Sequence, residues 1–201
     1  YESAGLTEIA GATPVSYGGV DVCLVGLDLN GVVLWNADGG SDGNDGAGGL
    51  AGEGDSIYIG VNFTGSNMTY TDFGLNTTAA QINTFLGSSD ISVCSFGASS
   101  GLYGWTEQVR GGSDAFCHDM IANSADLILC GSYNLGITFP TLGFGPLTML
   151  LSYDAIIWSM DNDNGACSWY CAEQTTGGTD ARATCLEFDQ AGNIVIGGEF
   201  N

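Results

Sequence analysis

Short apolar runs alternate with polar turns along the whole chain. Runs such as ISVC, LILC and IVIG are rich in β-branched residues, and Gly, Asn or Asp interrupts them roughly every 8–12 residues. Apolar residues do not recur with the 3.6-residue period of an amphipathic helix over any stretch of helical length. The pattern therefore predicts an all-β chain of antiparallel strands joined by turns.

The strand pattern is repeated three times. Aligned on the Asp that opens each copy, the segments read DVCLVGLDLNGVVLW from Asp21, DISVCSFGASSGLYGW from Asp90 and DAIIWSMDNDNGACSW from Asp154. A Gly precedes a Trp in every copy, and a Gly-Gly pair, an Asp and a short apolar run follow. The Gly/Trp pairs are Gly31/Trp35, Gly101/Trp105 and Gly165/Trp169, and the Asp residues are Asp45, Asp114 and Asp180. The copies begin about 64–69 residues apart, which divides the chain into units 21–89, 90–153 and 154–201.

The third unit stops before the segment that follows the apolar run in the second unit. Residues 1–20, YESAGLTEIAGATPVSYGGV, have the character of that missing segment. We therefore expect residues 1–20 to supply a strand that completes the third unit. The strand can complete the unit of its own chain and close a ring, or that of a neighbour and build a fibre by strand donation.

The order of these signals resembles a known repeat. Asp-strand-turn-Gly-x-x-x-Trp, then Gly-Gly-x-Asp, then Gly-Asn-apolar-Gly is similar to the bacterial β-propeller repeats called SBBP repeats, most clearly in residues 154–200. The resemblance covers nearly the whole chain and implies four-stranded blades, an extracellular or cell-surface location and no assigned catalytic site. Three units are fewer than the blades of an ordinary propeller, so the sequence predicts three blade-like antiparallel sheet repeats in a propeller-like or an open, polymerised array.

The charge of the chain is strongly one-sided. Its 23 acidic residues face only Arg110 and Arg182, and the formal net charge is −21. Nucleic-acid binding needs clustered cations, so we expect no nucleic-acid partner, and no apolar run is long enough for membrane insertion. We expect an acidic, hydrated surface and no bound metal. Calcium is the one cofactor that the sequence leaves open, at the acidic turns 161–165 and 41–46, although neither has the full EF-hand spacing.

Two stretches resemble catalytic motifs. GASSG, residues 97–101, matches the G-x-S-x-G of serine hydrolases, but the other copies have LDLNG and DNDNG at the same place. We therefore interpret it as a hairpin turn. In a strand, neighbouring residues point to opposite faces, so Cys117, His118 and Asp119 cannot converge on one substrate atom. The sequence predicts no catalytic residues and no enzyme.

The aromatic and cysteine residues follow the repeat. Recurrence of Trp35, Trp105 and Trp169 favours a role in the repeat core over a role as sugar-stacking platforms. Seven Cys residues with a single His and no C-x-x-C pair indicate an oxidising, extracellular compartment and argue against zinc. The candidate cross-strand disulfides are Cys171–Cys185 and Cys117–Cys130, and the odd number leaves a Cys that is free or bonded to another chain.

Three N-x-S/T sequons lie close together, at Asn62, Asn67 and Asn76. Because a glycan needs an exposed loop in a secreted protein, we expect N-linked glycans in this segment. The sequence as a whole favours a secreted, acidic, glycosylated structural protein that forms an extracellular fibre or surface assembly with itself or another extracellular protein. The alternative is a cell-surface binding module for a glycan or a protein, assisted by calcium.

Overall fold

The computed structural model describes residues 15–74, 76–78, 81–82, 88–139, 152–173 and 179–201. These residues form strands and turns and contain no helix, so none that could cross a membrane, which confirms the predicted all-β class. The strands, in chain order, are β1 (Val22–Leu27), β2 (Val33–Gly40), β3 (Asp45–Glu53), β4 (Ser56–Phe63), β5 (Asn67–Thr71), β6 (Gln81–Ile82), β7 (Asp90–Gly97), β8 (Tyr103–Gly111), β9 (Ala115–Ala122), β10 (Asp126–Tyr133), β11 (Ile137–Thr138), β12 (Asp154–Asp161), β13 (Cys167–Ala172), β14 (Ala181–Phe188) and β15 (Ile194–Phe200).

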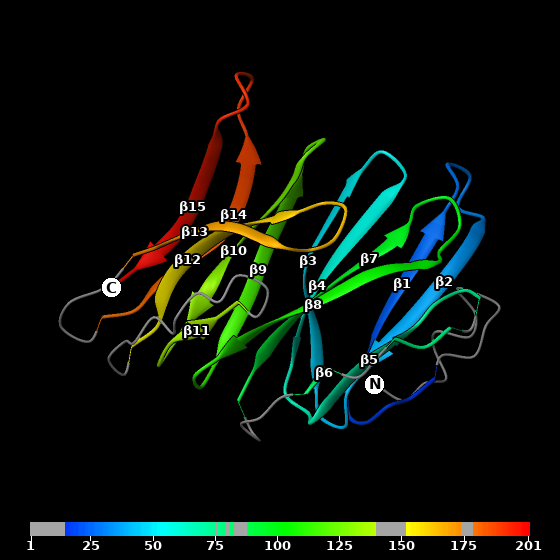
Figure 1. The fold of residues 1–201 in the computed structure, drawn as a ribbon, viewed down its shortest axis with the longest axis horizontal. Helices are drawn as coiled ribbons and strands as arrows, with labels where there is room; N and C mark the ends of the chain where they lie inside the picture. The colour runs from blue at the N-terminus through cyan, green and yellow to red at the C-terminus, as the bar shows by residue number, and fades with distance from the viewer. Residues whose placement is uncertain (1–14, 75, 79–80, 83–87, 140–151, 174–178) are drawn as a thin grey trace.

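The strands form several antiparallel sheets, none of which closes on itself. The strand orders are β1-β2-β5-β6, β3-β4-β7-β8-β11, β9-β10-β12-β13 and β14-β15. We refer to them as the first, second, third and fourth sheets. They stand side by side in a row, with β1 and β2 at one end and the β14–β15 hairpin at the other (Figure 1).

The second and third sheets each join two sequence units. In the second sheet β4 of one unit pairs with β7 of the next, and in the third sheet β10 pairs with β12. The register is the same at both junctions, because an aromatic residue at the end of one strand lies opposite the Asp that opens the next. These pairs are Phe63 with Asp90 and Tyr133 with Asp154. A unit of the sequence therefore extends over parts of two sheets.

A repeated hydrogen-bond clasp holds the start of each unit. The residue before the opening Asp donates its N–H to an Asp or Asn side chain, from Ser89 to Asp114 at 3.0 Å and from Tyr153 to Asp180 at 3.0 Å. In the first unit Val20 donates to Asn44 at 3.1 Å. The sequence alignment, which placed Asp45 with Asp114 and Asp180, is therefore wrong by one residue.

Apolar side chains fill the spaces between neighbouring sheets. One cluster, including Val61, Phe63 and Phe96, lies between the first and second sheets. A larger one, built around Trp158 and Tyr133, lies between the second and third sheets. The cluster between the third sheet and the β14–β15 hairpin is smaller, because two strands of the described part of the chain cover that side.

The chain before β1 belongs to the first unit where it is described. Gly19 donates its N–H to the carbonyl oxygen of Gly43 at 2.8 Å, and Val20 accepts from the N–H of Asp45 at 2.7 Å. Residues 15–20 thus lie against the turn before β3. The rest of the predicted donor strand, residues 1–14, lies outside the described residues, so completion of the third unit by residues 1–20 stays a prediction.

Candidate assembly interface

A tryptophan of the first sheet and one of the second sheet each pack on a glycine turn of the following sheet. Trp35 on β2 donates its Nε1–H to the carbonyl oxygen of Ala98 at 2.7 Å, and its indole lies on Gly101 in the β7–β8 turn. Trp105 on β8 donates in the same way to Asn162 at 2.9 Å and lies on Gly165 in the β12–β13 turn. The recurring Trp residues therefore connect neighbouring sheets.

The backbone conformation and the packing of these turns both require glycine. Gly101 and Gly165 have φ angles of 65° and 75°, a backbone region that L side chains rarely adopt. A Cβ atom on Gly101 would also lie 2.7 Å from the Trp35 indole, and one on Gly165 would lie 2.6 Å from the Trp105 indole. The Gly-x-x-x-Trp pattern of the sequence thus combines a turn with the Trp that reaches the following sheet.

The third Trp–Gly contact is not formed within the chain. Its tryptophan and its glycine turn lie at opposite ends of the row of sheets. Trp169, on β13 of the third sheet, is 37% exposed, whereas Trp35 is 3% exposed and Trp105 is partly buried. The glycine that corresponds to Gly101 in the first unit is Gly31, which has a φ of 80° and, apart from its chain neighbours, no atom of a described residue within 4 Å of its Cβ position. A tryptophan without a turn therefore lies at one end, and a turn without a tryptophan lies at the other.

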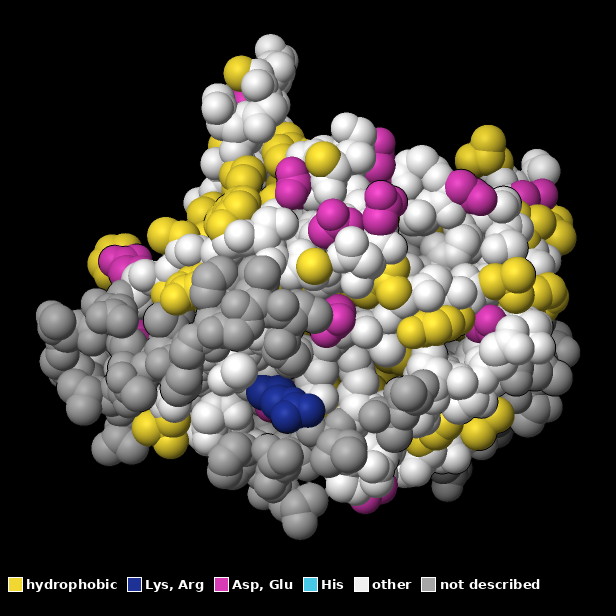
Figure 2. All heavy atoms as spheres, in the orientation of Figure 1, with side chains coloured by type: hydrophobic (Ala, Val, Ile, Leu, Met, Phe, Trp, Pro, Cys, Tyr) yellow, Lys and Arg dark blue, Asp and Glu magenta, His cyan; other side chains and the backbone are white. Residues whose placement is uncertain are grey.

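The strand edges are open at the same two ends. Among the described residues β15 is hydrogen-bonded only to β14, and β1 only to β2. Figure 2 shows hydrophobic side chains along the projecting β14–β15 hairpin, where Val195, Ile196 and Phe200 are exposed. At the other end the exposed hydrophobic residues are Leu27, Leu29, Val32 and Leu34. Unpaired edges with exposed apolar side chains are surfaces at which further strands add.

An apolar hollow of about 280 Å³ lies between the third sheet and the hairpin. Its lining is apolar apart from Glu173 and comprises Ala155, Ile156, Ile157, Cys171, Ala183 and Ile196. The hollow lies where two further strands would cover the third sheet if the fourth sheet had four strands. It is therefore part of the incomplete end of the row.

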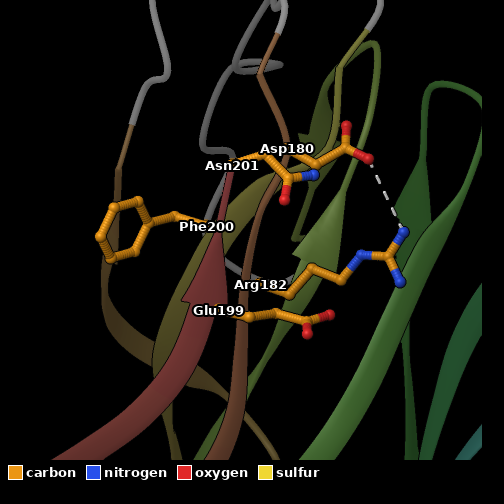
Figure 3. Close-up of a pocket in the computed structure, with 5 residues that line it drawn as sticks. All are labelled: Asp180, Arg182, Glu199, Phe200 and Asn201. Atoms are coloured by element: carbon orange, nitrogen blue, oxygen red, sulfur yellow. Dashed lines mark ion pairs between the residues drawn. The ribbon is translucent and has the colours of Figure 1, made fainter.

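A second hollow at this end is polar and has a volume of about 190 Å³. Figure 3 shows its lining residues, Asp180, Arg182, Glu199, Phe200 and Asn201. The Arg182 guanidinium lies 3.8 Å from the Asp180 carboxylate and 5.0 Å from the centre of the Tyr153 ring. One of the two cations of the chain thus contacts residues that precede β12 and β14, which leaves little positive charge for an anionic ligand.

A side-chain clamp joins the second and third sheets. The Asn62 carboxamide donates from Nδ2 to the carbonyl oxygen of Cys117 at 2.9 Å and accepts from the N–H of Cys117 at 2.7 Å. β9, which carries Cys117, is an edge strand, and the clamp satisfies backbone groups that no strand pairs with. Sequence reasoning missed this contact because Asn62 was interpreted only as part of a sequon.

The side-chain amides of the three sequon asparagines differ in how accessible they are for glycosylation. Both polar atoms of the Asn62 amide are used in the clamp, and Nδ2 of Asn76 donates to both carboxylate oxygens of Asp72 at 3.1 and 3.0 Å. Asn67 is exposed and donates only to the hydroxyl of Ser66, its chain neighbour. Glycosylation stays a prediction, and the folded chain presents Asn67 most openly.

The residues of the catalytic-looking motifs serve turns and strands. Ser99 lies in an exposed turn, where its N–H and hydroxyl both bond to the Asp55 carboxylate, at 2.9 and 3.0 Å. His118 Nε2 is 2.9 Å from the hydroxyl of Ser132, and burial lowers the pKa of the imidazole. Cys117 is buried, and the Asp119 carboxylate accepts from the N–H of Leu186 at 2.8 Å. None of these groups faces another in the manner of a nucleophile and its base.

All seven cysteines are free thiols in the structure, including the two pairs predicted as disulfides. Cys117 belongs to the cluster between the second and third sheets, whereas Cys130 belongs to the cluster on the other side of the third sheet. These side chains point to opposite faces, which a bridge cannot span. Cys171 and Cys185 are exposed, on β13 and β14. Cys23, on the open strand β1, has a pKa of about 11 because of burial and the nearby Asp38.

The carboxylates of the acidic turns accept hydrogen bonds from residues of the same turn. In the turn 161–165 the Asp161 carboxylate accepts from the N–H of Asp163 at 2.8 Å, and in the turn 41–46 Asp45 accepts from the N–H and hydroxyl of Ser41, both at 2.6 Å. Within the described ranges no group of three or more His, Cys, Asp or Glu side chains is placed to hold a metal ion. Calcium binding at these turns stays a prediction.

Comparison with known proteins gives this chain no family. No model of a protein family matches the sequence, and no curated protein matches it. The resemblance to SBBP repeats therefore stays an expectation from the repeat pattern.

Proposed function

We propose that this chain is a secreted, acidic, glycosylated structural protein that builds an extracellular fibre or surface layer through its β-repeats. The observation that carries the proposal is the complementarity of the ends: the exposed Trp169 and the edge of β15 at one end, the open turn at Gly31 and the edge of β1 at the other. Each end lacks what the other has. In this proposal the sheets are blades of a propeller-like array that continues from one molecule to the next.

The charge distribution is consistent with this role. A net charge of −21 without Lys keeps a surface hydrated in an ion-rich medium and makes the lateral faces of two molecules repel each other. Short-range apolar contacts at the ends then decide the direction in which molecules associate. Growth in one direction yields fibres or rows within a layer.

A cell-surface binding module is the second candidate. The observation that favours it is the exposed indole of Trp169 in the same sheet as residues that line the 280 Å³ hollow, because an exposed indole offers a flat surface for a sugar ring. In this candidate the same end binds a glycan or another extracellular protein, with calcium at an acidic turn as a support.

Electron microscopy of the 201-residue chain, together with analytical ultracentrifugation over a concentration series, tests the first proposal. We expect filaments, sheets or a ladder of assemblies whose share grows with protein concentration. A monomer that stays monomeric up to millimolar concentration at physiological salt would overturn it. Saturable quenching of tryptophan fluorescence by a soluble oligosaccharide, lost in Trp169→Ala, would instead support the binding module.

A further inference from the structure

We infer that two copies of this chain join head to tail, with the edge of β15 paired antiparallel to the edge of β1 of the second copy and Trp169 seated on the second copy's Gly31. The inference rests on the proposed assembly function and names its partner, a second copy of this chain. The two internal junctions of the structure fix the geometry of the contact.

The register follows from the repeat. At both internal junctions the aromatic residue that ends one strand lies opposite the Asp that opens the next, and pairing continues without a shift for eight residues. The equivalent residues at the open ends are Phe200 and Asp21. Placing them opposite each other sets Ile196 opposite Val25, and Ile194 opposite Leu27, of the second copy. The completed sheet then has the order β14-β15-β1-β2, which repeats the order β9-β10-β12-β13 of the third sheet.

The side chains in this register have the chemistry of the internal junctions. Ile196 and Val25 correspond to Ile59 and Cys94 in one junction and to Leu129 and Trp158 in the other, and all four of these are buried. They face the preceding sheet in both cases. The corresponding face of β1 therefore covers the third sheet of the first copy, where the apolar hollow now lies open.

The tryptophan contact independently supports a second copy of this chain as the partner. Trp35 and Trp105 each lie on a glycine with positive φ in the following sheet and donate to the carbonyl oxygen at an equivalent turn position, in Ala98 and Asn162. Counted from the opening Asp, the corresponding position in the first unit is Leu29, which is fully exposed. The first-unit turn is one residue shorter than the other two, because it closes from Asp28 to Val32. The Trp169 indole thus finds both a carbonyl acceptor and a turn without a Cβ on the second copy. A partner of unrelated sequence would have to reproduce both features.

One chain cannot make this contact with itself in the observed structure, because β1 and β15 stand at opposite ends of the row (Figure 1). A head-to-tail contact either closes a small ring of copies or continues as an open filament. The contact is the same in both cases, so the interface and the fibre can be tested separately.

Site-directed cross-linking tests the register. Val25→Cys and Ile196→Cys are combined in a full-length chain that also carries Cys23→Ser, Cys171→Ser and Cys185→Ser, and the protein is treated with dibromobimane. Residues directly opposite in a sheet have Cβ atoms about 5 Å apart, so we expect covalent oligomers on a denaturing gel. The control pair, Val25→Cys with Val195→Cys, places the thiols on opposite faces and should remain uncross-linked.

Two further variants test the tryptophan contact by analytical ultracentrifugation. Trp169→Ala and Gly31→Asn should each weaken association at least about tenfold, because buried Trp contacts dominate interfaces and Asn tolerates positive φ but fills the seat. The matched controls are Leu102→Ala, an exposed apolar residue at an internal turn, and Gly54→Asn, another glycine with positive φ and open space. Both controls should associate like the parent.

The outcomes separate the two proposals. Cross-linked chains of many copies support both the interface and the fibre, whereas cross-linked closed dimers support the interface and overturn the fibre. Filaments that form while the Val25→Cys and Ile196→Cys thiols stay unlinked, or that tolerate Trp169→Ala, overturn the interface and leave the fibre standing. A monomer at all concentrations overturns both.

Discussion

The Asn62 carboxamide and the Cys117 peptide group form a pair of hydrogen bonds, at 2.9 and 2.7 Å, between the second and third sheets. Apolar side chains and the hydrogen bond from Trp105 to Asn162 also join these two sheets, and the Asn62 pair adds a direct link between β4 and the backbone of β9. The two hydrogen bonds are part-buried, and their loss would leave the N–H and carbonyl of Cys117 without partners.

Replacement of Asn62 by Ala should destabilise the fold. We expect the free energy of unfolding to fall by about 1–3 kcal/mol, since two backbone groups lose their partner in a part-buried site. Urea denaturation followed by tryptophan fluorescence measures the loss. Asn67→Ala is the matched control and should change stability by less than about 0.5 kcal/mol, because Asn67 is exposed. Equal stability of both variants would contradict the clamp.

Glycan occupancy should follow access to the amide. If the chain is secreted from a glycosylating host, we expect glycan on Asn67 and none on Asn62, whose two polar amide atoms are both bonded to Cys117. Mass spectrometry of chymotryptic glycopeptides measures occupancy at each site, since the chain has no Lys or Arg before Arg110 for trypsin to cleave. Asn67→Gln should remove most of the glycan mass, and Asn62→Gln should leave it unchanged. High occupancy at Asn62 would show that the clamp forms too late to protect it.

Alanine at Gly165 should cost more stability than alanine at Gly54. Both glycines have positive φ, 75° and 59°, which costs an L residue roughly 1–2 kcal/mol. Gly54 has open space around its Cβ position, whereas a Cβ on Gly165 would lie 2.6 Å from Trp105. We expect a loss of about 1 kcal/mol for Gly54→Ala and roughly 2–4 kcal/mol for Gly165→Ala by thermal denaturation. Similar losses at both positions would mean that the indole is not held against the turn.

The stability of Asp38→Asn relative to the parent should grow as pH rises. Burial raises the pKa of the Asp38 carboxyl, so the folded state favours the protonated form. The contribution of Asp38 to the stability of the folded state is complete below the ordinary carboxyl pKa of about 4. This contribution is lost as the pH rises through the raised pKa of the folded state. Melting temperatures of both proteins from pH 4 to pH 8, in high salt to screen the net charge, should diverge in favour of the variant. Parallel curves would contradict the prediction.

Thiol reactivity should distinguish exposed from buried cysteines. We expect Cys171 and Cys185 to react first with Ellman's reagent under native conditions, and Cys23 to react slowly because its pKa is about 11. Cys94, Cys117, Cys130 and Cys167 are buried and should react only on unfolding. Unfolding without a reductant should then release the full count of seven. A count lower by two would show that one bridge forms in the native material.

The strand pattern alone determined the class and the repeat of this protein. Alternation of apolar and polar residues with Gly, Asn and Asp at the turns leaves no alternative to antiparallel strands, and the Gly-x-x-x-Trp spacing located the three equivalent hairpins. Both signals are local, since they depend on the period of a strand and the φ angle of a turn residue. They could be read without knowing which strands pair.

Pairing between units was decided only by the tertiary structure. The sequence could not show that β4 pairs with β7 across a unit boundary, or that Asn44 rather than Asp45 occupies the clasp. It also could not place Cys117 and Cys130 on opposite faces of one sheet, because a bulge shifts the register between them. Trp35, Trp105 and Trp169 are equivalent in the sequence, yet Trp35 is buried, Trp105 is partly buried and Trp169 is exposed, since only the first two pack on a turn of a following sheet.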